Sequence, residues 1–124
     1  MKREREPMKT RSTEKRKHAR FPVRVLIRYR NADRFFQDYI ENISIGGIFV
    51  ETADPLSIGT NLNLQFSLPG MGSPIQADGV VVHLVKGGAR SFPVAGGMGI
   101  KFSELNDKNK ELLEDYVRVH TKVS

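Results

Sequence analysis

The chain has 124 residues, about the size of one average domain, so a single compact core is expected. It has no cysteine, which excludes a disulfide framework, a thiolate zinc site and a cysteine nucleophile. The sequence contains neither the roughly 18 to 20 consecutive apolar residues of a membrane-spanning helix nor the apolar segment of a signal peptide. We therefore expect a cytoplasmic protein that does not insert into a membrane.

Positive charge is concentrated at the start of the chain. The net charge is +6, yet residues 1–30 hold twelve Lys or Arg against three Glu, and the remaining residues have a small acidic excess. A segment this charged and this poor in apolar residues buries too little surface to offset the entropy of ordering it, so residues 1–14 are expected to form a flexible basic arm. Such an arm is either a solvated tail or a segment that closes on a polyanion, and composition does not separate the two.

Six short strands are expected after this arm, because apolar residues alternate with polar ones and turn residues separate the runs. They are predicted at residues 23–30, 34–43, 48–52, 61–68, 75–86 and 97–102. Asn31–Asp33 is typical of a hairpin turn, and Gly79 indicates a bulge or sharp bend within its strand. Because no helices intervene, the pattern predicts an antiparallel barrel or sandwich.

The periodicity becomes helical near the end of the chain. Apolar residues from Leu105 to Val117 recur at intervals of three, four and seven, with Asn106 or Asp107 as the N-cap. This amphipathic helix is expected to pack on the side or end of the barrel.

Enzyme motifs are absent from the sequence. The three histidines, His18, His83 and His120, lack metal-ligand spacing, and the glycine run at residues 96–99 lacks the Lys-Ser/Thr of a phosphate loop. Ser44 does not lie in a Gly-x-Ser-x-Gly elbow and has no visible general base. The sequence therefore favours a binding protein, with no cofactor and no metal.

Two short motifs stand out together. Arg16 and Arg20 lie four residues apart just before the first strand, and Asn42, Ser44 and Gly47 lie between the second and third strands. With these motifs in this order, the chain resembles a PilZ domain, the bacterial receptor module for cyclic di-GMP, whose members carry Arg-x-x-x-Arg followed by Asp/Asn-x-Ser-x-x-Gly.

The resemblance covers residues 15–118 and implies a fold and its boundaries. It implies a six-stranded antiparallel β-barrel at about residues 21–103 and a C-terminal α-helix at about residues 106–121. The PilZ domain would then span residues 15–124 and follow the basic arm at residues 1–14.

The resemblance also implies a role for each motif residue. Arg16 and Arg20 would contact the phosphates and guanines of cyclic di-GMP, since guanidinium groups match both with bidentate geometry. Asn42 would accept hydrogen bonds from guanine N–H groups, and Ser44 would supply a short donor. Gly47, which has no Cβ, would allow close approach of the ligand or of the backbone.

Lys15, just before the first arginine, bears on the number of ligands bound. A basic residue there resembles the arrangement that accommodates a stacked dimer of the nucleotide, whereas an apolar residue goes with one molecule. The charge of Lys15 would offset the extra negative charge of a second ligand, so two molecules per site are favoured over one.

The function implied is a non-enzymatic cyclic di-GMP receptor or adaptor that changes its surface to regulate an unidentified effector protein. One alternative is a small nucleic-acid-binding barrel, suggested by the arm and by Phe35, Phe36 and Tyr39. These aromatics are expected in the core or in strand pairs, and the acidic excess after residue 30 argues against a basic groove, so no DNA is expected. A second alternative is a PilZ-like adaptor that binds only protein, but such members typically lose the arginines that remain here.

Overall fold

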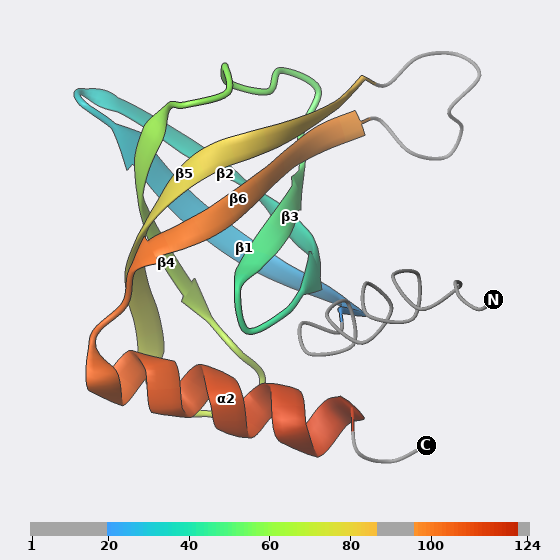
Figure 1. Cartoon of the computed structure of the whole chain (residues 1–124), viewed down its shortest axis with the longest axis vertical. Coiled ribbons are helices and arrows are strands. Elements are labelled where there is room, and N and C mark those ends of the chain that lie inside the picture. The colour runs from blue at the N-terminus through green and yellow to red at the C-terminus, as the bar shows by residue number, and fades with distance from the viewer. Residues whose placement is uncertain (1–19, 87–95, 122–124) are drawn as a thin grey trace, which may run out of the picture.

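Six antiparallel strands close into a barrel in the computed structural model, which describes residues 20–86 and 96–121 (Figure 1). The strands follow one another around the barrel in the order β1-β2-β3-β6-β5-β4. Their bounds are β1 Phe21–Asn31, β2 Arg34–Ile43, β3 Gly47–Glu51, β4 Asn61–Ser67, β5 Pro74–Lys86 and β6 Gly96–Glu104. The predicted six-stranded barrel with a C-terminal helix is confirmed, whereas the predicted arm at residues 1–14 lies outside the described residues.

Alternation decides which side chains fill the barrel. On β4 the leucines Leu62 and Leu64 and the ring of Phe66 are buried, while the polar residues between them are exposed. β1 pairs with β2 through a tight turn at Ala32, whose φ is 54°, and its second half also pairs with β4. This second pairing closes the barrel.

Gly79 marks an irregularity in β5, as the sequence predicted. The pairing of β5 with β6 shifts register between Asp78 and Gly79. A Cβ at Gly79 would lie 2.6 Å from Cγ2 of Ile100, so the glycine makes room for a core side chain. The register shift therefore falls where the side chain of Ile100 occupies the space of a Cβ.

One tyrosine brings a hydroxyl group into the barrel. Tyr29 on β1 is 3% exposed, stacks on Phe36 with ring centroids 5.0 Å apart, and donates a hydrogen bond to Oδ2 of Asp38 at 2.6 Å. Burial, and then the hydrogen bond to the Asp38 carboxylate, raise the pKa of Tyr29 well above the usual tyrosine range. The hydroxyl is thus held as a neutral donor.

The helix α2, Asp107–Thr121, lies across one end of the barrel (Figure 1). Asn106 is its N-cap, since its Oδ1 accepts the backbone N–H of Asn109 at 2.8 Å. Leu113, Tyr116 and Val117 are buried with the barrel core, and Nδ2 of Asn109 donates to the backbone oxygen of Gln76 on β5 at 3.0 Å. Within residues 20–86 and 96–121, no helix is long and apolar enough to span a membrane.

Candidate ligand-binding site

Two residues from the separate sequence motifs meet where β1 begins beside the end of β2. Nη1 of Arg20 donates a hydrogen bond to Oδ1 of Asn42 at 2.6 Å, across 22 positions of sequence. Pro22, two residues after Arg20, pairs with Asn42 in the sheet, and this brings Arg20 close to Asn42. The predicted site residues Lys15 and Arg16 lie outside the described residues.

Both strand pairs are irregular at this point. The β1–β2 register shifts between Pro22 and Val25, and the β2–β3 register shifts between Ile40 and Asn42. Bulges of this kind bend a strand and re-aim its side chains, and they occur preferentially next to functional sites. Both register shifts lie close to Asn42, where β1 begins beside the end of β2.

Ser44 lies inside the turn between β2 and β3. Its side chain is buried at 2% exposure, and its Oγ accepts the N–H of Gly46 at 3.2 Å and lies 3.4 Å from the carbonyl oxygen of Gly47. The backbone N–H of Ser44 donates to the same carbonyl oxygen at 2.9 Å. The hydroxyl predicted to contact ligand is therefore engaged in shaping the turn.

Gly47 is required by the close approach of β6. A Cβ at this position would overlap the carbonyl oxygen of Ile100 on the neighbouring strand β6. The glycines with positive φ among the described residues are Gly59, Gly70, Gly72 and Gly96. The close approach of a backbone at Gly47 is therefore confirmed, whereas close approach of a ligand there stays a prediction.

The outer surface continues from Asn42 over β3, β6 and β5. Asn42 pairs with Phe49, Phe49 with Gly99, and Gly99 with His83, which places these four residues in one row on the outside of the barrel. The ring of Phe49 also covers Gly97, where a Cβ would come within 2.8 Å of Cε2 of that ring. The sequence indicated only strand packing for this glycine run, so its outward face was missed. The signal was the alternation of Gly97 and Gly99 with the buried residues Met98 and Ile100.

Charge at this edge is unevenly compensated. Arg24 lies 4.0 Å from the ring centroid of Tyr39, and its Nη1 is 3.7 Å from Oε1 of Glu51. Arg20 is exposed, bonds only the neutral amide of Asn42, and makes no ion pair with another residue of the described part of the chain. Its positive charge remains available to an anion.

The chain matches a known protein family. The model of the PilZ domain matches residues 14–118, and a search of curated proteins found no match. The chain is similar in fold to the Bacillus subtilis inhibitor of motility (MotI/DgrA), with 23% identity, a TM-score of 0.72, and coverage of 85% of this chain and 50% of that one.

Two solved structures that contain cyclic di-GMP are also similar in fold. The PilZ domain of YcgR from Escherichia coli with c-di-GMP is 14% identical, with a TM-score of 0.59 and coverage of 86% of this chain and 97% of that one. The K. pneumonia MrkH–c-di-GMP complex is 20% identical, with a TM-score of 0.69 and coverage of 85% and 52%.

The chain spans about half the length of MotI/DgrA and of MrkH. At these identities the structural likeness establishes the fold, while the family model matches most of the sequence, including the motif residues Arg16, Arg20, Asn42, Ser44 and Gly47. The chain belongs to the PilZ domain family.

Proposed function

We propose that this chain is a cyclic di-GMP receptor whose site is the edge formed by Arg20 and Asn42, completed by Arg16 and Lys15 from the preceding segment. The observation that supports it best is the 2.6 Å hydrogen bond between Arg20 and Asn42, because it joins a residue of one motif to a residue of the other. Family membership and similar proteins whose structures contain c-di-GMP support the same ligand.

The side chains at this edge suit the chemistry of the nucleotide. An exposed guanidinium offers paired donors to phosphate oxygens or to the O6/N7 edge of guanine. Asn42 holds Arg20 with its carbonyl oxygen, so its Nδ2 and the second lone pair of Oδ1 are left for a guanine. Ser44 and Gly47 act by fixing the turn beside Asn42.

A receptor rather than an enzyme is the role supported by this arrangement. The hydroxyl of Ser44, the obvious nucleophile near the site, is buried and bonded within the turn. The output would be a change of surface read by an effector protein, whose identity the site does not specify. A cytoplasmic location remains a prediction.

Isothermal titration with cyclic di-GMP tests the proposal. Arg20→Ala and Arg16→Ala should each weaken binding by about 2 kcal/mol, or roughly 30-fold, the usual scale for a charge-assisted contact. Arg28→Ala is the matched control, since Arg28 is exposed on the same strand β1 but away from this edge. Normal binding by the Arg20 variant would reject the site.

The same titration measures how many ligands bind. Two molecules per chain are expected for the native protein, and Lys15→Ala should bring the number to one by removing a counterion. Single-stranded DNA titrated at two salt concentrations serves as the competing ligand, and DNA binding in the absence of cyclic di-GMP binding would favour the nucleic-acid alternative.

Amide hydrogen exchange tests the change of surface. A ligand bridging Arg16 and Arg20 to the β2–β3 turn should raise protection at residues 13–21 and 42–47 and leave α2 nearly unchanged. Equal protection of residues 13–21 with and without ligand would reject this mechanism even if the ligand binds.

A further inference from the structure

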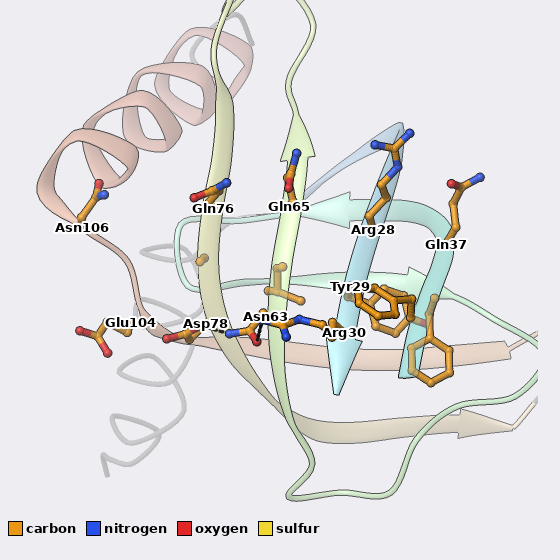
Figure 2. Close-up of a pocket in the computed structure, with 14 residues that line it drawn as sticks. Arg28, Tyr29, Arg30, Gln37, Asn63, Gln65, Gln76, Asp78, Glu104 and Asn106 are labelled. Carbon is orange, nitrogen blue, oxygen red and sulfur yellow. Dashed lines mark hydrogen bonds between the residues drawn. The ribbon is translucent and has the colours of Figure 1, made fainter. Parts of the chain in front are cut away.

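A hollow of about 790 Å³ lies on the outer face of β2, β1, β4 and β5, away from the edge formed by Arg20 and Asn42 (Figure 2). Its volume is in the range of pockets that hold small molecules. The hollow uses the end of β1 and the start of β2, whereas the candidate cyclic di-GMP site uses the start of β1 and the end of β2. The two sites are therefore separate surfaces.

The first row of side chains across this hollow consists of one arginine and three glutamines. Sheet register places Gln37 beside Arg28, Arg28 beside Gln65, and Gln65 beside Gln76, one residue from each of four neighbouring strands (Figure 2). The three glutamines of this row are all the glutamines of the chain. Within the described part of the chain, the four side chains make no hydrogen bond or ion pair, so their polar groups are free for a ligand.

The second row is already ordered by its own hydrogen bonds. Arg30 donates to Oδ1 of Asn63 at 3.0 Å, and Nδ2 of Asn63 donates to Oδ1 of Asp78 at 2.6 Å. At the end of this row the guanidinium of Arg30 lies 5.9 Å from the ring centroid of Phe35, which is 76% exposed. This row needs little reorganisation to present its remaining lone pairs and N–H groups.

Charge in the hollow cancels. Two arginines, Arg28 and Arg30, and two carboxylates, Asp78 and Glu104, line the hollow. Its lining therefore has no net formal charge and favours neither anions nor cations. The remaining polar groups are carboxamides, and each offers a donor and an acceptor in one plane. Flat groups of this kind match pairs of neighbouring hydroxyls, and an exposed ring such as Phe35 packs against the apolar face of a sugar ring.

The spacing of the rows selects the shape of the ligand. Neighbouring strands lie about 4.8 Å apart, so each row presents one side chain at roughly the repeat of one sugar unit in an extended β-1,4-linked chain. We propose that this hollow binds a neutral, extended oligosaccharide of about three sugar units running across β2, β1, β4 and β5.

Titration of the ¹⁵N-labelled protein with neutral hexasaccharides tests the proposal. The probes are hexamers of β-1,4-linked glucose, β-1,4-linked xylose and α-1,4-linked glucose, each to about 10 mM, since millimolar affinity is easily detected at that concentration. At least one β-1,4 hexamer should shift the amide signals of residues 28–30, 35–37, 63–65 and 76–78. If neither β-1,4 hexamer shifts these signals, the proposal is overturned, whether or not the α-1,4 hexamer does.

Variants separate the hollow from non-specific contact. Gln65→Ala combined with Gln76→Ala should weaken hexasaccharide binding about tenfold, the scale of two lost neutral hydrogen bonds. Ser67→Ala, on the exposed face of β4 beyond the hollow, should leave binding unchanged. An unchanged affinity in the double glutamine variant, with a dispersed spectrum showing that it is folded, would overturn the assignment.

Two further measurements fix the ligand class and the independence of the site. A hexamer of β-1,4-linked glucuronic acid, which keeps the linkage and adds only carboxylates, should bind at least fivefold more weakly than the β-1,4-linked glucose hexamer, because Asp78 and Glu104 line the hollow and repel the added carboxylates. Tighter binding of this anion would overturn the choice of a neutral ligand. Cyclic di-GMP affinity should be the same in the double glutamine variant as in the native protein, and its loss would overturn the separation of the two sites.

Discussion

The outer face of β3 and β6 is built on glycines, whereas the outer face of β1 and β4 carries long polar side chains. On the first face, Gly47 and Gly97 let a neighbouring backbone or ring approach where a Cβ would overlap it. On the second, Arg28 and Gln65 project from the sheet without restricting the backbone beneath them. The first surface is thus tied to folding and the second is not, and substitutions on the two should differ accordingly.

Gly47→Val should give the largest effect on stability. Its Cβ would overlap the carbonyl oxygen of Ile100, and backbone atoms of two paired strands cannot move apart without breaking the pairing. We expect a loss of about 3 kcal/mol or more in the free energy of unfolding, measured by chemical denaturation.

Gly99→Val is the matched control for this variant and should lose less stability, because the nearest atom to its Cβ is the side-chain Cβ of His83 at 3.2 Å rather than a backbone oxygen. Native-like stability of Gly47→Val would show that the close approach of β3 and β6 does not require a glycine at this position.

Tyr29→Phe tests the layer beneath the polar face. Loss of the hydroxyl that donates to Asp38 should lower the free energy of unfolding at pH 7 by about 1.5 to 3 kcal/mol, because the acceptor is a partly buried carboxylate. Arg28→Ala, on the surface above, should change stability by less than about 0.5 kcal/mol.

The pH dependence of the same variant checks the cause. The folded protein disfavours ionised Tyr29, so its stabilising effect is complete below about pH 10 and is lost as the pH rises above that value. The native protein should therefore lose stability above about pH 10 more steeply than Tyr29→Phe. Some decline should remain in the variant because burial also raises the pKa of Tyr116. Parallel curves for the two proteins would contradict the assignment.

Ser44→Ala should have the smallest effect of the three. Removal of the Oγ that accepts from Gly46 should lower the free energy of unfolding by about 0.5 to 1.5 kcal/mol and weaken cyclic di-GMP binding no more than that. Ser44→Thr, which keeps a hydroxyl, is the comparison variant. A loss of affinity as large as that of Arg20→Ala would instead mean that the hydroxyl contacts the ligand directly.

Local patterns in the sequence predicted most of the fold. Alternation located the six strands, the lone Gly79 located the register shift in β5, and the Asn106 cap located the start of α2. Each of these signals is carried by neighbouring residues and by the backbone, so no long-range information was needed.

The parts missed depend on which strands become neighbours. The family resemblance predicted that Arg20 and Asn42 belong to one site, whereas their direct hydrogen bond and the hydrogen bonds of Ser44 within the turn depend on three-dimensional geometry. Phe35 was expected in the core or in a strand pair; it pairs across the strands with Arg30, and its exposure of 76% excludes the core. The row of glutamines is invisible in sequence because its members are exposed residues of separate strands.

Closure of the barrel has a consequence for how any signal leaves the domain. β1 pairs with both β2 and β4, so the six described strands form a closed ring. A strand added by a partner, the recognition mode known as β-augmentation, would therefore have to pair with a segment that has no neighbour in the ring, such as the first half of β1, which β4 does not pair with. Under the proposed function, an effector would then recognise mainly the outward side chains and the described loops of the barrel.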